Sequence, residues 1–135
     1  MASILVAASA EPSAILQRIL AGHDLSLAQT MAQAEGLLHA RHFDLIVCAI
    51  VFDESKMFDL LGLVKSRPQW QGIPFVGARV RGDILRSQKA VQAAAFTCLE
   101  LGAVAFLDIA EYRVDPEREM RDAIDRLLGG RAPAG

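Results

Sequence analysis

The strongest hydrophobic signal in the chain is an unbroken apolar run at residues 45–51, rich in β-branched side chains. A strand with one face in water would alternate apolar and polar residues, so a run without polar members predicts a strand buried on both faces. Such a strand lies at the centre of a parallel sheet that helices cover on each side. Polar residues at 53–56 end the run, and residues 57–66 have the apolar spacing of a helix.

Strand and helix patterns alternate along the rest of the chain. Further strands are predicted at residues 3–8, 23–29, 73–78 and 103–109, and further helices at 14–21, 31–41, 84–101 and 116–128. Residues 9–13 are predicted as a turn, with Ser9 or Ser13 as the helix cap and Pro12 suited to a first helical position. Five strand–helix units with right-handed crossovers predict an α/β three-layer sandwich. We expect one domain over residues 1–135, with its core at 3–128 and a flexible tail at 129–135.

Composition narrows the class of protein. The 135 residues are 53% hydrophobic and 22% charged, which is typical of one globular domain. The net charge is −2 and no basic stripe is visible, so nucleic acid is not an expected partner. No apolar run approaches the ~20 residues that span a bilayer, and the N-terminus lacks the positive charges of a signal peptide. We therefore expect a cytoplasmic protein in which Cys48 and Cys98 are free, buried thiols.

Four segments resemble the receiver domain of response regulators, the CheY-like family, in the family's order. They are ILVAASAEP at residues 4–12, FDLIVCAI at 43–50, IPFVGA at 73–78 and LGAVAFLD at 101–108. The resemblance covers about residues 4–128. It implies a flavodoxin-like (βα)5 fold with the sheet order 2-1-3-4-5.

Receivers share one reaction, in which an aspartate takes a phosphoryl group from a histidine kinase while carboxylates hold Mg²⁺. The resemblance places the family's acidic pair on Ala8 and Ser9, and neither is a carboxylate. It places the phosphoacceptor on Ala49, whose methyl group cannot attack phosphorus. No magnesium site, other metal site or cofactor is therefore expected.

The remaining family positions are also changed. The resemblance places the Ser/Thr hydroxyl on Arg79 and the lysine on Ile109, while the aromatic position of the fifth strand keeps its type as Phe106. The apolar positions that pack the family's core are kept, whereas its polar catalytic positions are replaced. We interpret the chain as a pseudo-receiver and not as an enzyme.

Charged residues beyond the lost acceptor leave alternatives open. Asp53 and Glu54 are either a displaced acceptor or metal ligand, or a solvated loop and helix cap. Arg79 either pairs with Asp53, Glu54 or Asp108, or is exposed, or binds an anion together with Arg81.

The predicted fourth helix, at residues 84–101, is about two turns longer than in a typical receiver, at ~3.6 residues per turn. Its apolar stripe is wider than one contact with a sheet needs. Either this is a longer core helix, or it offers a partner surface that includes Ile84, Val91, Ala94 and Phe96. Receivers use the fourth helix, fifth strand and fifth helix for dimerisation and output, so a homodimer or partner interface is predicted there.

Other candidates have simpler interpretations. His39 and His42 lack the further ligands of a zinc site, and Trp70 is expected to cover the edge of the sheet. Two functions remain. The favoured one is a non-phosphorylatable signalling module of a bacterial two-component pathway that binds a protein, such as a histidine kinase or response regulator. The alternative is a module that binds a small anion or nucleotide through Arg79 and Arg81 at the carboxyl edge of the sheet.

Overall fold

A computed structural model describes residues 2–80 and 87–131, which fold around a five-stranded parallel sheet. The strand order, β2-β1-β3-β4-β5, confirms the predicted α/β flavodoxin-like topology. The strands are β1 (Ser3–Ala7), β2 (Asp24–Ala28), β3 (Leu45–Ala49), β4 (Phe75–Arg79) and β5 (Ala105–Asp108).

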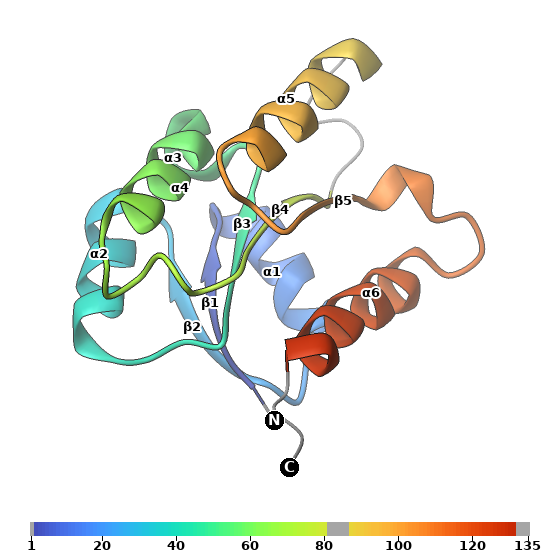
Figure 1. Ribbon diagram of the computed structural model, residues 1–135. Coiled ribbons are helices and arrows are strands. Elements are labelled where there is room, and N and C mark those ends of the chain that lie inside the picture. The colour runs from blue at the N-terminus through green and yellow to red at the C-terminus, as the bar shows by residue number, and fades with distance from the viewer. Residues whose placement is uncertain (1, 81–86, 132–135) are drawn as a thin grey trace.

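Helices cover both faces of this sheet (Figure 1). They are α1 (Ala10–Ile19), α2 (Met31–Ala40), α3 (Phe52–Ser55), α4 (Met57–Ser66), α5 (Gln88–Glu100) and α6 (Pro116–Arg131), with a 3-10 turn η1 (Ile109–Glu111) after β5. Helices α2, α4 and α5 pack on one face, and α1 and α6 on the other. Among the described residues, no helix combines the length and the apolarity that crossing a bilayer needs.

The central strand β3 explains why its sequence has no polar member. All five of its residues are buried. Ile46 and Cys48 pack under α2, α4 and α5, whereas Leu45 and Val47 pack under α1 and α6. Successive side chains of a strand point to opposite faces, so a strand covered on both faces needs apolar residues throughout.

The first helix begins earlier than predicted. Helix α1 starts at Ala10 with Ser9 as its N-cap, so the predicted turn at residues 9–13 and the helix start at residue 14 are wrong. Pro12 lies in the first turn of the helix, where a missing backbone N–H removes no intrahelical hydrogen bond. By contrast, α4 has the predicted bounds.

The predicted helix at residues 84–101 is corrected at its N-terminal end. Ser87 is the N-cap of α5 in extended conformation, with φ −111° and ψ 127°, and its hydroxyl accepts a hydrogen bond from the Ala90 N–H at 3.3 Å. The helix therefore begins at Gln88, and residues 84–86 lie outside the described part of the chain. At the other end of the domain, α6 continues to Arg131, beyond the predicted end at Leu128. Of the predicted tail, residues 132–135 also lie outside the described part.

Candidate functional site

The carboxyl ends of the parallel strands meet at one edge of the sheet, which gathers most of the residues that the sequence singled out. Ala8 follows β1, Ala49 ends β3, and Arg79 and Asp108 end β4 and β5. Arg79 and Asp108 are also register partners across β4 and β5. Open α/β sheets bind ligands at this edge, so it is the candidate site.

The middle of this edge is apolar. Ala8 and Ala49 are 1% and 2% exposed, and their side chains are methyl groups. Ser9, the N-cap of α1, makes no side-chain capping hydrogen bond. Magnesium needs several oxygen ligands, and these three side chains supply one hydroxyl. Within residues 2–80 and 87–131, no three or more His, Cys, Asp and Glu side chains are placed to share a metal ion. The residues present do not fit the magnesium site that the resemblance implies.

A bidentate ion pair borders the apolar centre. The Arg79 Nε donates to Asp108 Oδ1 at 2.9 Å, and Nη2 donates to Oδ2 at 3.0 Å. The two residues are only 5% and 3% exposed. Asp108 Oδ1 also accepts from the Ala110 N–H at 3.0 Å, which starts η1 directly after the strand. Of the three carboxylates considered for Arg79, Asp108 is the one found in this contact.

This ion pair bears on anion binding. The guanidinium of Arg79 is buried with a carboxylate that matches both its charge and its planar fork. Arg79 is thus not the exposed residue that one alternative assumed. Arg81, its predicted companion in anion binding, lies outside the described residues. The geometry therefore does not favour an anion or nucleotide site based on Arg79.

The loop after β3 has an unusual backbone. Asp53, Glu54 and Ser55, within the short α3, have φ angles of 44°, 56° and 68°. Residues with a β-carbon rarely adopt this left-handed region, and each costs of order 1–3 kcal/mol. Three in succession without a glycine give no recognisable turn signal in the sequence. This is why the sequence predicted only a loop here.

Contacts of Asp53 hold this left-handed turn. Its Oδ2 accepts a hydrogen bond from the Met31 N–H at 2.8 Å, and Lys56 Nζ donates to the Asp53 carbonyl at 3.2 Å. The carboxylate thus lies at the N-terminus of α2, where the helix dipole favours negative charge. The sequence offered Asp53 as a displaced acceptor or metal ligand, or as a residue of a solvated loop or a cap for the following helix. Glu54 is exposed.

Replacing Glu54 by glycine should stabilise the protein. Glu54 has φ 56° and an exposed side chain, so the substitution relieves backbone strain without removing a buried contact. We expect the free energy of unfolding to rise by about 1 kcal/mol, because glycine adopts positive φ without steric cost. Urea denaturation measures the change. The matched control is Glu54→Ala, which keeps the β-carbon and should give no gain. Equal stability of the two variants would contradict backbone strain at Glu54.

The aromatic position of β5 faces the space under α5. Phe106 is half-buried and lines a groove of about 100 Å³ between α5 and β5, together with Gln92 and Ala95. Its ring lies against Gly77 of β4, where an added β-carbon would be 2.8 Å from Phe106 Cδ2. Ile109, predicted to end the strand, instead begins η1.

Large apolar side chains are exposed beside this groove. Phe96 and Leu99 of α5 are 65% and 50% exposed, and Val104 is 49% exposed. Phe96 and Leu99 are three residues apart and so neighbours on the helix, and Leu99 follows the groove residue Ala95 by one turn. Val104 and Phe106 alternate by two and therefore share one face of the chain. We call Phe96, Leu99, Val104 and Phe106 the α5–β5 surface.

The α5–β5 surface replaces part of the predicted interface. Phe96 is exposed, whereas Val91, also predicted for the interface, is 3% exposed and packs inside the domain, where it offers no contact surface. Ala94 is half-buried and lines a separate cavity beside α4. Ile84 lies outside the described residues. The helical spacing identified an apolar stripe correctly, but could not tell which side of a wide stripe faces the sheet.

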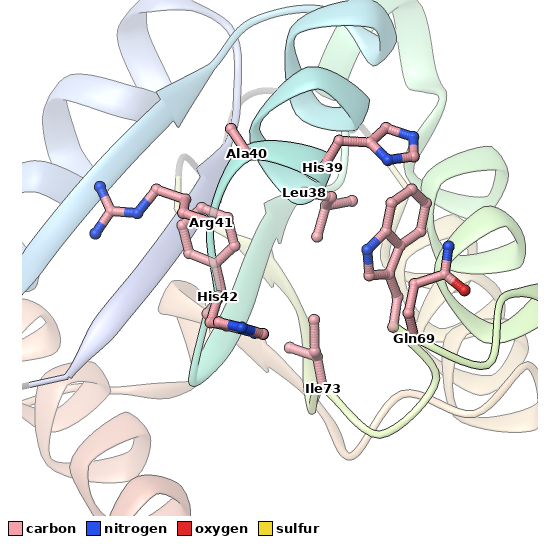
Figure 2. A pocket seen from close by; sticks show the side chains of 9 residues that line it. Leu38, His39, Ala40, Arg41, His42, Gln69 and Ile73 are labelled. Carbon is pink, nitrogen blue, oxygen red and sulfur yellow. The ribbon is translucent and has the colours of Figure 1, made fainter.

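A second hollow, of about 310 Å³, lies before the amino ends of β3 and β4, away from the carboxyl edge (Figure 2). It is lined by Leu38, His39, Ala40, Arg41, His42, Phe43, Gln69, Trp70 and Ile73. Trp70 is 4% exposed, with the His39 ring 4.8 Å away and the Arg67 guanidinium 5.7 Å from its centroid. Arg41 forms an ion pair with Asp24 of β2. Because neighbours already cover the indole, Trp70 closes this edge and does not present a free ring face to a ligand.

Comparisons with known proteins identify the fold. No known family profile and no curated protein sequence matches the chain. Solved structures do match. The receiver domain of a signal transduction histidine kinase from Syntrophus aciditrophicus aligns with a TM-score of 0.73 and 21% identity, covering 100% of this chain and 97% of that one. A phosphorylated cyanobacterial phytochrome response regulator, RcpA, gives 0.74 and 15%, with coverages of 98% and 96%.

A third match is the receiver domain of a sensor histidine kinase from Pseudomonas aeruginosa, which has a magnesium ion coordinated in its active-site cleft. Its TM-score is 0.66 at 14% identity, and the alignment covers 95% of this chain and 98% of that one. At these identities the likeness shows the fold. The structural neighbours of this chain are therefore response-regulator receiver domains, as the resemblance implied.

Proposed function

We propose that this chain is a receiver-like signalling module that accepts no phosphoryl group and acts through protein–protein contact in a cytoplasmic two-component pathway. One observation carries the proposal. At the edge where receivers perform their chemistry, two buried methyl groups and a buried, charge-paired Arg79–Asp108 occupy the space. The fold is kept, whereas the atoms that phosphoryl transfer needs are absent from these positions.

The argument from chemistry has two parts. Phosphoryl transfer to protein needs a nucleophilic oxygen, which the methyl group of Ala49 cannot supply. It also needs cations to neutralise the developing charge, and Ala8 and Ser9 supply no carboxylate for magnesium. The nearest carboxylate in the loop after β3, Asp53, already accepts the Met31 N–H. The state of this module would therefore be set by binding and not by a phosphate.

The α5–β5 surface is the proposed contact face. Phe96, Leu99 and Val104 each leave about half or more of their surface in water. Clustered exposed apolar residues mark protein-interaction sites more often than isolated ones. We propose that a second copy of this chain, or a histidine kinase or response regulator, binds here.

A phosphorylation assay tests the first part of the proposal. The protein is incubated with acetyl phosphate, or with beryllofluoride, in the presence of Mg²⁺. We expect no mass gain and no shift of backbone amide resonances, because no carboxylate stands at Ala49. A phosphorylated receiver serves as positive control. A mass gain of one phosphoryl group that disappears in Asp53→Asn would refute the proposal and make Asp53 the acceptor.

Solution mass tests the contact face. Phe96→Asp should convert a dimer into a monomer, because burying a carboxylate in an apolar interface without a partner is costly. Leu27→Asp is the matched control: Leu27 is 44% exposed on β2, at the opposite edge of the sheet, and this variant should remain dimeric. Light scattering measures the solution mass of the wild type and of both variants. A monomeric wild type that Phe96→Asp leaves unchanged would remove self-association through this face.

A further inference from the structure

The one tryptophan of the chain carries an unpaired hydrogen-bond donor. Trp70 is 4% exposed, and its indole N–H donates to none of the described residues, although a buried indole N–H ordinarily has a partner. Within the described part of the chain, every fully buried side-chain nitrogen or oxygen is hydrogen-bonded. The indole nitrogen must therefore lie on the small part of Trp70 that is accessible. Trp70 lines the hollow of about 310 Å³ before β3 and β4, which thus receives this donor.

The C-terminal end of α2 supplies acceptors to the same hollow. Leu38, His39 and Ala40 end the helix, and all three line the hollow. The last carbonyl groups of a helix have no N–H ahead of them within the helix. The Arg41 N–H donates to the Leu37 carbonyl, whereas no described residue donates to the three carbonyls that follow. The negative end of the helix dipole lies here too, so this end of α2 disfavours an anionic ligand.

Side chains complete a small and partly apolar hollow. Leu38, Phe43 and Ile73 are its apolar members, and His42 and Gln69 are among its polar ones. Figure 2 shows His42 and Gln69 on opposite sides of Leu38 and Ile73. Sites for small molecules typically measure about 300–1,000 Å³ and combine apolar walls with a few polar groups. At about 310 Å³, this hollow suits one ring system and not a dinucleotide.

The loop that carries Trp70 is held in place by the protein itself. The Trp70 N–H donates to the Arg67 carbonyl at 3.0 Å. Lys65 Nζ donates to the carbonyls of Gln71 and Ile73, at 3.0 and 3.2 Å. A site whose loop is already ordered loses less conformational freedom when a ligand binds. The indole N–H is therefore in position before binding.

We propose that this hollow binds a small, uncharged, planar heterocycle whose edge carries a C=O beside an N–H, as many nucleobases do. The ligand C=O accepts from the indole N–H of Trp70, and the ligand N–H donates to a carbonyl at the end of α2. The amide of Gln69 both donates and accepts, so it suits either group. The apolar walls favour a flat ring. This site lies away from the carboxyl edge and does not depend on the proposed signalling function.

Titration of the ¹⁵N-labelled full chain with hypoxanthine tests the site. Because the chain has one tryptophan, its indole N–H gives a single NMR resonance. We expect hypoxanthine to shift this resonance downfield until it saturates, since the N–H gains a hydrogen bond. Unsubstituted purine has no carbonyl and should bind about tenfold more weakly, and inorganic phosphate should not bind. An indole resonance that neither hypoxanthine nor uracil moves at millimolar concentration would overturn the proposal.

Three variants assign the binding to this hollow, with calorimetry as the measurement. Trp70→Phe keeps an aromatic ring but removes the N–H, and should weaken hypoxanthine binding by about tenfold. Gln69→Ala should also weaken it. The matched control is Gln71→Ala, which changes an exposed glutamine of the same loop that does not line the hollow and should bind like the wild type.

Thermal denaturation of each variant separates loss of binding from loss of fold. Gln69 is exposed, so Gln69→Ala keeps the test valid even where Trp70→Phe unfolds the domain. If Gln69→Ala and folded Trp70→Phe bind as tightly as Gln71→Ala, the heterocycle is held elsewhere and the proposal is wrong. Neither result would bear on phosphorylation or on the contact face.

Discussion

Replacing Arg79 by methionine is expected to lower the free energy of unfolding by about 3–5 kcal/mol. Asp108 is 3% exposed in the wild type, and the substitution leaves its carboxylate with the Ala110 N–H as its one hydrogen-bond donor among the described residues. A buried charge that loses its counter-ion keeps its full desolvation cost and loses the attraction that offset it. Urea denaturation at neutral pH measures the effect.

The double variant Arg79→Met with Asp108→Leu is the control for this prediction. It removes both charges and fills the space with apolar atoms, so its stability should return to within about 1–2 kcal/mol of the wild type. If the single substitution at Arg79 costs less than about 1 kcal/mol, the pair behaves like an exposed salt bridge. That result would contradict its role as a buried ion pair at this edge of the sheet.

The Arg79–Asp108 pair also links the candidate site to the α5–β5 surface. Arg79 and Asp108 end the two strands β4 and β5, and their hydrogen bonds join those ends directly. Asp108 in turn starts η1, and Phe106, two residues earlier, reaches the groove under α5. The candidate site and the α5–β5 surface are thus joined by a few consecutive residues of one strand. Under the proposed function, a partner would bind the α5–β5 surface in this arrangement without a phosphate.

The sequence predicted the fold well because its signals were local and periodic. The apolar run of β3 identified a strand buried on both faces, and the bounds of α4 were predicted without error. Errors arose where the same residues suit two different local structures. The Ser-Ala-Glu-Pro segment suits a turn and equally the start of a helix. The helix forms because its continuation buries Leu16 and Ile19. Ser87 likewise served as a cap inside a longer helical pattern.

The candidate site was only partly predictable, for reasons of tertiary structure. Arg79 and Asp108 are 29 residues apart, and only the strand register selects Asp108 over other carboxylates as its partner. The contact between Asp53 and Met31 likewise joins the turn after β3 to the first residue of α2, 22 residues earlier. The left-handed turn at residues 53–55 has no glycine to announce it. The crowding of Phe106, Cys98 and Met57 over Gly77 depends on the packing of α4 and α5 on the sheet, which no local pattern encodes.

Gly77→Ala is the second substitution with a large expected effect, a loss of about 1–3 kcal/mol in the free energy of unfolding. The new methyl group would lie 2.8 Å from Phe106 Cδ2, 2.9 Å from Cys98 Sγ and 3.1 Å from Met57 Sδ. Two of these distances are shorter than carbon makes to non-bonded neighbours, so the packed side chains must move apart. Met57 is flexible, but Cys98 has a single side-chain torsion and Phe106 is a rigid ring. Chemical denaturation measures the loss.

Gly62→Ala provides a control of opposite sign. Gly62 is an exposed position inside α4, and an added β-carbon there would meet nothing within 4 Å. Alanine has fewer backbone conformations than glycine in the unfolded chain, so folding costs less conformational entropy. The free energy of unfolding should therefore rise by about 0.5–1 kcal/mol. The same chemical change would thus stabilise one site and destabilise the other, which isolates crowding over the sheet as the cause. A Gly77→Ala protein as stable as the wild type would show that the side chains above β4 are loosely packed, and that Phe106 is not held in place by its contact with Gly77.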